Sequence, residues 1–114
     1  MTDSEKIVQA QLDAYNNRDI DAFVACFSED VQVLTFPDNQ LKENSSGKNF
    51  RAGYEKMFAE LTNLHCKVVN RCVHGNIVVD QEEVTGLTDP TKILKALAIY
   101  EVTDGIITKV WFAK

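Results

Sequence analysis

The chain lacks the signals that mark membrane and secreted proteins. No stretch approaches the roughly 20 consecutive apolar residues of a membrane-spanning helix. The first residues, MTDSEKIVQAQ, have no basic region followed by an apolar run, so we expect no secretory signal. The three cysteines are an odd number, which suits reduced thiols better than a disulfide framework. We therefore expect a cytoplasmic protein with no membrane partner.

Clustered positive charge is also missing. The 114 residues include 17 acids and 12 bases, for a net charge of −5, and no run of five like charges occurs. Nucleic acids and anionic membranes bind clustered Lys and Arg, so we expect neither as a partner. The five glycines are too scattered for a phosphate loop or a dinucleotide fingerprint, and we expect no cofactor.

Two histidines and two cysteines occur close together in the sequence, but their spacing argues against zinc. Cys66 and Cys72 would stand about 20 Å apart on one strand, whereas a zinc ion needs its sulfur ligands about 2.3 Å away. Cys72 and His74 are close neighbours, and two ligands do not make a site. We interpret these residues, with His65, as packed thiols and surface imidazoles and expect no metal.

The apolar residues that are present predict helices first and strands after. An apolar content of 45% suits a globular protein, and we expect one domain over residues 1–114. Helical spacing is found at residues 3–17, where Thr2 and Glu5 fit a capping box, in a shorter segment capped by Asp19, and at residues 48–62. Strand patterns are found at residues 31–36, 65–74, 77–85, 93–103 and 106–113. The polar residues 40–46 are expected to form a loop or a short edge strand. This order predicts an α+β fold with the helices on one face of the sheet.

Two short turns predict how the later strands pair. Gly75-Asn76 suits a type II′ turn and Asp104-Gly105 a type I′ turn, and a two-residue loop sets the register of its strands. Around the second turn, Ala98 should lie opposite Trp111. The face expected under the helices is wholly apolar and consists of Leu94, Ala96, Ala98, Tyr100 and Val102.

The hairpin around Gly75-Asn76 has polar residues on both faces, so alternation alone leaves two orientations open. In one orientation, Arg71, Asp80 and Glu82 form an ion pair cluster on the outer face. In the other, this trio lies in the pocket, and Glu82 is its general base. A polar side chain on the inner face must be hydrogen-bonded or border a cavity.

The segment IVQAQLDAYNNRDIDAFVACFSEDVQVLTFPDN resembles the opening of nuclear transport factor 2-like proteins. That superfamily includes SnoaL-like polyketide cyclases and ketosteroid isomerases. The segments GNIVVDQEEVTG and AIYEVTDGIITKVWF are similar to bacterial SnoaL-like proteins of unassigned function. The resemblance implies a cone-shaped, cystatin-like α+β fold, with N-terminal helices packed on a curved, mainly antiparallel sheet around a pocket. It also implies a homodimer.

The residues that carry ketosteroid isomerisation are missing. That reaction needs a carboxylate base, with a Tyr and a protonated Asp as hydrogen-bond donors. The resemblance assigns these positions to Thr35, Gln11 and Ala98, none of which has the required side chain. Relatives often have His where Gln81 stands, and Gln is neither acid nor base near neutral pH. We therefore do not expect steroid isomerase activity.

The resemblance also implies an orientation for the first hairpin. It implies that the inward residues are Asn70, Cys72, Val79, Gln81 and Glu83. Glu83 is then the candidate catalytic base, with its pKa raised by burial, and Glu82, Asp80 and Arg71 are the fallback. We expect a small apolar organic ligand in the pocket. The expected ligand-binding residues are Tyr15, Val33, Tyr54, Asn70, Gln81, Ala98, Tyr100 and Trp111.

An alternative function is a non-enzymatic interaction domain. The outer sheet face is expected to carry an apolar strip of Ile93, Leu97, Ile99, Val110 and Phe112. Such a strip suits a two-fold dimer interface, and we expect a homodimer through this face. The two functions differ in whether the interior of the cone is open or filled by Trp111, Tyr54 and Met57.

Overall fold

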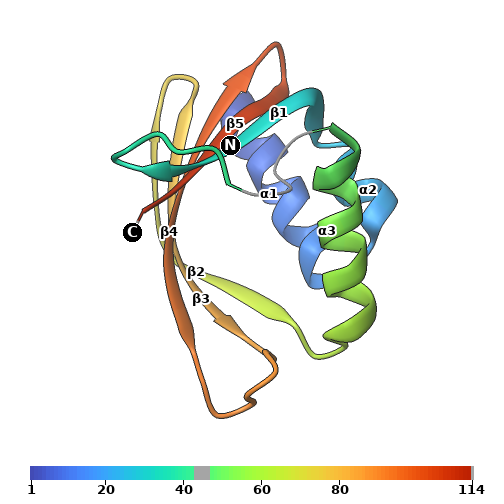
Figure 1. Ribbon diagram of the computed structural model, residues 1–114. Helices are drawn as coiled ribbons and strands as arrows, with labels where there is room; N and C mark the ends of the chain where they lie inside the picture. The colour runs from blue at the N-terminus through green and yellow to red at the C-terminus, as the bar shows by residue number, and fades with distance from the viewer. Residues whose placement is uncertain (43–46, 114) are drawn as a thin grey trace.

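The computed structural model describes residues 1–42 and 47–113 (Figure 1). The elements of the described chain are α1 (Asp3–Asn16), α2 (Ile20–Val24), β1 (Phe27–Phe36), α3 (Gly47–Glu60), β2 (His65–His74), β3 (Ile77–Thr85), β4 (Leu94–Thr103) and β5 (Ile106–Ala113). Every expected helix and strand is present, although β1 begins at Phe27 rather than at Val31. Leu41 forms an isolated bridge to Leu34, so part of the expected loop or edge strand over residues 40–46 pairs with β1, and its residues 43–46 lie outside the described ones.

The strands form one curved sheet in the order β1-β5-β4-β3-β2. β1 runs parallel to β5, and the other neighbours are antiparallel, so the sheet is mainly antiparallel as expected. Figure 1 shows the helices gathered on the concave side of this sheet. The apolar faces of helices and sheet meet there, which confirms the predicted α+β architecture.

α1 and α2 begin at the predicted capping residues. The Thr2 hydroxyl accepts a hydrogen bond from the backbone N–H of Glu5 at 3.1 Å, and the Asp19 carboxylate accepts one from Ala22 at 3.2 Å. Each cap satisfies a backbone donor that has no partner within its helix. No helix in the described ranges is long and apolar enough to cross a membrane.

A bulge at Thr108 changes the faces of β5. The turn has its predicted left-handed backbone, with φ of 52° at Asp104 and 78° at Gly105. Glu101 pairs with Lys109 while Val102 pairs with Ile107, so Thr108 is the extra residue in β5. Its hydroxyl bonds the Glu101 carbonyl at 3.2 Å.

The expected pairing of Ala98 with Trp111 is therefore wrong. Ala98 lies opposite Phe112, and Tyr100 lies opposite Val110. Val110 and Phe112 thus face the helices, whereas Trp111 is on the outer face. The predicted outer strip was wrong at these two positions for the same reason.

A second bulge, at Val69, changes the faces of β2. The expected pairs of Arg71 with Asp80 and of Asn70 with Gln81 are present, but Val68 lies opposite Glu82, which leaves Val69 as the extra residue. Regular alternation from Arg71 would turn Val69 and Lys67 inward. The bulge instead places Val68 and Cys66 on the inner face, and Val69 is exposed.

The inner face of β3 carries the acids that the family resemblance placed outside. Asp80 and Glu82 are buried, at 0% and 6% exposure, between the buried Val78 and Val84. The orientation implied by the resemblance is therefore wrong. Its five supposedly inward residues lie on the outer face or remain accessible: Asn70, Cys72, Val79, Gln81 and Glu83. The alternative orientation, with Arg71, Asp80 and Glu82 inside, is the observed one.

Gly86 allows the end of β3 to pass close to the segment that precedes β2. Its φ is 75°, and a Cβ at this position would overlap the backbone of Asn63 and Leu64. We expect G86A to lower the free energy of unfolding by about 2–4 kcal/mol, because Ala combines a strained φ with a backbone clash. Urea denaturation measures this change.

The matched control is G53A, which makes the same substitution inside α3. Gly53 is exposed, and a Cβ there would meet no described atom within 4 Å. Because Ala is a better helix former than Gly, G53A should raise the free energy of unfolding by about 0.5–1 kcal/mol. A G86A protein as stable as the unsubstituted chain would contradict the close approach at Gly86.

Candidate functional site

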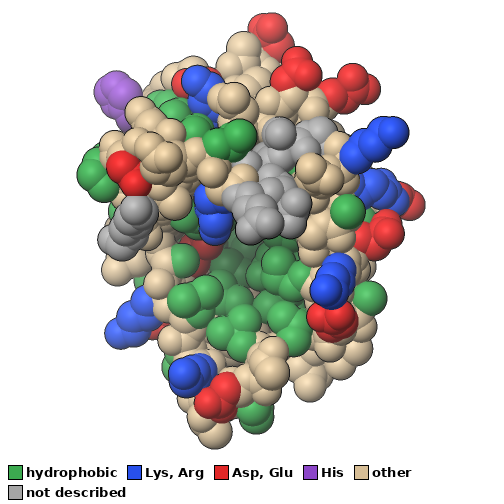
Figure 2. Space-filling model, viewed as in Figure 1, with side chains coloured by type: hydrophobic (Ala, Val, Ile, Leu, Met, Phe, Trp, Pro, Cys, Tyr) green, Lys and Arg blue, Asp and Glu red, His purple; other side chains and the backbone are tan. Residues whose placement is uncertain are grey.

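A cavity of about 350 Å³ lies between the concave face of the sheet and the helices. Space-filling Figure 2 shows the hollow, with hydrophobic side chains over most of its visible floor. Its aromatic wall is made of Tyr15, Phe23, Phe27, Phe50, Tyr54 and Phe112. The volume is at the lower end of the range of roughly 300–1,000 Å³ that is usual for small-molecule pockets.

The aromatic wall is held together by ring contacts around Phe23. The centroid of its ring lies 4.6 Å from that of Tyr54 and 4.9 Å from that of Phe27. These rings come from the predicted apolar stripes of α2 and α3 and from the start of β1. Tilted ring contacts of this kind stabilise the wall beyond simple burial of area.

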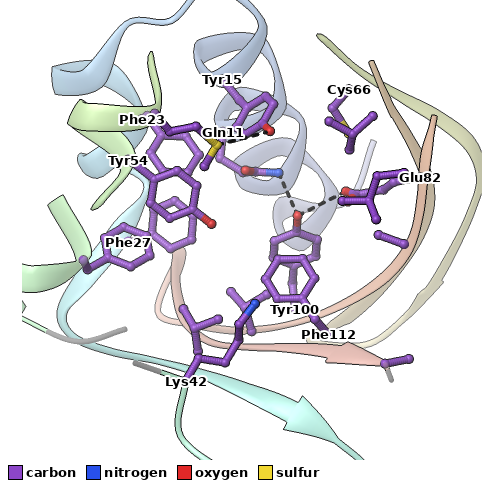
Figure 3. A pocket seen from close by; sticks show the side chains of 18 of the residues that line it. Gln11, Tyr15, Phe23, Phe27, Lys42, Tyr54, Cys66, Glu82, Tyr100 and Phe112 are labelled. Atoms are coloured by element: carbon purple, nitrogen blue, oxygen red, sulfur yellow. Dashed lines mark hydrogen bonds between the residues drawn. The ribbon is translucent and has the colours of Figure 1, made fainter. Parts of the chain in front are cut away.

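Tyr54 presents an unpaired hydroxyl to the cavity. It forms no hydrogen bond to another residue in the described part of the chain, and Figure 3 shows its oxygen directed into the space between helices and sheet. Burial, with a smaller effect of the Glu82 charge, raises the pKa of Tyr54 to about 12. The hydroxyl therefore keeps its proton at neutral pH and can donate to a ligand oxygen.

Glu82 is the buried carboxyl group of the cavity. The Tyr100 hydroxyl donates to Glu82 Oε2 at 3.4 Å, and the Gln11 side-chain amide donates to the Tyr100 oxygen at 3.1 Å (Figure 3). Gln11 and Tyr100 are themselves almost fully buried. This chain of hydrogen bonds holds the Glu82 carboxyl at one orientation against the cavity.

Its surroundings place the titration of Glu82 near neutral pH. Burial raises the pKa of Glu82 to about 7, and the neighbouring Asp80 acts in the same direction. Hydrogen bonds from Tyr100 and Cys66 and the charge of Arg71 act in the opposite direction. A carboxyl with this pKa can both accept and release a proton at physiological pH.

Cys66 lies beside Glu82 and is positioned by α1. The Asn16 side chain donates to the Cys66 carbonyl at 3.0 Å and accepts from the Cys66 N–H at 2.8 Å. Burial, followed by the effect of Glu82, raises the pKa of Cys66 to about 12. The thiol therefore stays protonated and is a hydrogen-bond donor rather than a nucleophile.

Arg71 and Asp80 form a buried ion pair next to the cavity. Arg71 Nε and Nη2 lie 2.7 and 3.0 Å from the two oxygens of the fully buried Asp80. Arg71 Nη1 also donates to Gln9 Oε1 at 2.8 Å, and Glu5 lies 3.9 Å away. Neither Arg71 nor Asp80 lines the cavity. The pair therefore joins α1 to the sheet and influences Glu82 through its charges.

The predicted ligand-binding residues divide into two groups. Those that line the cavity are Tyr15, Val33, Tyr54 and Tyr100. Those that do not are Asn70, Gln81, Ala98 and Trp111. Ala98 is on the inner face but is fully buried by its neighbours, and the Trp111 indole bonds Asn39 Oδ1 at 2.8 Å on the outer face. Trp111 thus does not fill the interior.

Some cavity residues were not predicted as ligand-binding residues. Gln11 was placed at a site position only through the family resemblance, Cys66 was interpreted as a packed thiol, and Phe112 was assigned to the outer face. Lys42 follows β1 in the polar segment 40–46, which was expected to form a loop or a short edge strand and gave no sign of a ligand-binding residue. The described residues contain no group of three or more His, Cys, Asp or Glu side chains that could hold a metal ion.

The raised pKa of Glu82 predicts that stability falls as pH rises. The folded state binds the Glu82 proton more tightly than the unfolded chain, whose Glu titrates near its ordinary value of 4.5. The contribution of Glu82 to stability is therefore fully present below about pH 4.5 and is lost as pH rises through about 7. Between pH 5 and 8, the stability of E82Q relative to the unsubstituted protein should increase by roughly 2–3 kcal/mol.

Urea denaturation at both pH values tests this prediction. The matched control is E83Q, which makes the same substitution one residue further along β3, on the outer face. A pH dependence of equal size in E82Q and E83Q would contradict the assignment to Glu82.

Comparison with known proteins identifies the family of the chain and its fold. A model of the SnoaL-like domain matches residues 8–110. No curated protein matches significantly. Solved structures are also similar to the chain, and three examples follow. Each is less than 25% identical in sequence to the chain, so the similarity concerns the fold.

The first is a cystatin-fold protein from Novosphingobium aromaticivorans, with a TM-score of 0.86 and 22% identity, covering 100% of this chain and 99% of that one. The second is an NTF2-like protein of unknown function from Cytophaga hutchinsonii, with a TM-score of 0.75 and 18% identity. The match covers 96% of this chain and 87% of that one. The third is an LEH-like epoxide hydrolase from M. tuberculosis, with a TM-score of 0.80 and 19% identity. The match covers 97% of this chain and 81% of that one.

Proposed function

The chain belongs to the SnoaL-like domain family. On that premise we propose that its cavity binds a small, mainly apolar organic molecule and moves a proton from one atom of this molecule to another. Glu82 is the general base and acid of this reaction. The observation that carries the proposal is a single buried carboxyl, with a pKa of about 7, in a cavity walled by aromatic rings. Such a perturbed group in a cleft is typical of catalytic sites.

The chemistry follows from the groups around the cavity. The Glu82 carboxylate removes a proton from a carbon next to a carbonyl or similar group, and the electrons of the C–H bond move to the oxygen. The Tyr54 hydroxyl donates a hydrogen bond to that oxygen as its charge increases. Protonated Glu82 then returns the proton to another atom of the ligand, so the overall reaction is an isomerisation.

This arrangement differs from that of the ketosteroid isomerases to which the sequence was compared. By resemblance, Gln11 and Ala98 stand where those enzymes have a phenolic and an acidic donor. The Gln11 amide instead donates to Tyr100, and Ala98 has no donor to offer. A carboxylate base on β3 is the alternative here. One structural neighbour is named as an epoxide hydrolase, which supports a pocket for small organic molecules without specifying this reaction.

Proton abstraction can be tested with 5-nitrobenzisoxazole, a small carbon acid whose ring opening is followed by absorbance. The base takes the proton from C3, the C–H electrons form the nitrile, and the N–O bond breaks to give 2-cyano-4-nitrophenolate. We expect kcat/KM to rise with pH and to level off above about 7, where Glu82 is ionised. E82Q should lower kcat/KM about 100- to 1,000-fold because Gln accepts no proton.

E83Q is again the matched control, because its carboxyl lies on the same strand but faces away from the cavity. It should keep the rate and the pH profile of the unsubstituted protein. If E82Q and E83Q had equal rates, the proposal of Glu82 as the base would be rejected.

We also propose that the chain is one domain over residues 1–114 that acts in the cytoplasm, without a nucleic-acid or membrane partner. The net charge of −5 supports the absence of polyanionic partners. No cofactor is part of the reaction that we propose.

A homodimer through the outer face of the sheet is part of the proposal. The bulge at Thr108 replaces Val110 and Phe112 in the predicted strip with Trp111. A row of mainly apolar residues then crosses all five strands at one level: Cys72, Val79, Ile99, Trp111 and Leu34. A continuous row of this kind on one face suits an isologous two-fold contact.

Ile99 is in the middle of this row, so I99E should turn the dimer into a monomer, because the contact would bury two carboxylates without partners. Sedimentation velocity at micromolar concentration measures the change. A59E, on the exposed side of α3, is the control and should remain dimeric. A monomeric unsubstituted protein would contradict the dimer, and so would a dimeric I99E.

A further inference from the structure

Lys42 places one positive charge at the mouth of the cavity. Its backbone N–H donates to the Val33 carbonyl at 2.9 Å, which ties the residue to β1. Its side chain lines the cavity, and Nζ lies 4.9 Å from the centroid of the Phe112 ring. Figure 3 shows this side chain reaching inward from the β1 side, and Lys42 as a whole remains exposed to solvent.

This charge has no carboxylate partner within ion-pair distance in the described part of the chain. The protein is acidic overall, with a net charge of −5, so an unpaired lysine at an apolar cavity is notable. Lys95 is also at the cavity, but it alternates with the inward Ala96 on β4 and, like its cross-strand neighbour Glu83, belongs to the outer face of the sheet. Among the described lysines, Lys42 is the one whose side chain lies over a ring of the cavity wall, so it is the cation that we assign to a ligand.

The cavity consequently has two poles. Glu82 is buried and carries negative charge above pH 7, whereas Lys42 is positive and accessible at the mouth. A ligand anion next to Glu82 would meet like charge in surroundings of low dielectric constant, which is costly. The same anion near Lys42 would meet opposite charge while remaining partly hydrated.

We infer that the ligand is an apolar, ring-containing molecule with one anionic group, of which a carboxylate is the simplest example. The anion binds Lys42 at the mouth, and the ring lies against Phe112 and the aromatic wall. The neutral end that loses its proton then points at Glu82. This inference rests on the proposed function of the cavity and adds a substrate class and an orientation to it.

Two fluorescent probes with the same aromatic body test the inference. 1-Anilinonaphthalene-8-sulfonate carries one negative charge, and N-phenyl-1-naphthylamine is its neutral counterpart. In 20 mM salt, K42M should weaken binding of the sulfonate about five- to tenfold and change binding of the neutral probe less than about twofold. K42E should weaken the sulfonate further and leave the neutral probe unaffected.

Two controls separate this inference from the proposed function. K56M removes a lysine of α3 that does not line the cavity, and it should leave both affinities unchanged. A96F places a ring in the cavity, and it should weaken both probes alike. Circular dichroism and thermal melting establish that each variant is folded.

The outcomes are distinct. If K42M weakened both probes equally, or neither, the anionic ligand class would be overturned while the pocket itself remained. If the unsubstituted protein bound neither probe, or if A96F had no effect on either, the pocket as a binding site would fail and the inference with it. Selective loss of the sulfonate alone supports both.

Discussion

The buried ion pair of Arg71 and Asp80 determines which face of β2 and β3 meets the helices. Asp80 is completely buried, and both of its oxygens are bound by one guanidinium group, which also reaches Gln9 on α1. If the hairpin turned over, α1 would lose this link to the sheet. Breaking a buried pair by removing one partner typically costs about 3–5 kcal/mol. The same choice of face brings Glu82 into the cavity, two residues along β3.

Much of the fold follows from local sequence patterns. The helical stripes, the capping residues Thr2 and Asp19 and the two glycine-containing turns all predicted their elements, because each depends on neighbours within a few residues. The pairing next to each turn was also predicted correctly, for instance Arg71 opposite Asp80. The aromatic wall was only partly predicted, through Tyr15 and Tyr54.

The site was harder to predict because its residues depend on β-bulges that lie several residues away from the turns. Each of two strands contains one extra residue, Val69 or Thr108, and no sequence signal distinguishes it from an ordinary strand residue. Beyond each bulge, odd and even positions exchange faces. Trp111 was therefore placed inside and Phe112 outside, the reverse of the structure. For the acids of β3, alternation left both faces open, and the wrong one was chosen by analogy with relatives.

The bulge at Val69 has a consequence for the history of this fold. Removing that residue would leave the flanking pairs, Val68 with Glu82 and Asn70 with Gln81, on their present faces. A lineage could therefore gain or lose one codon in β2 without changing which side chains surround the ligand. If the sequence of a relative that lacks the extra residue is aligned to this chain without a gap there, residues that face the cavity are matched with residues that face outward. A functional role known for the relative is then assigned to the neighbour of the side chain that performs it.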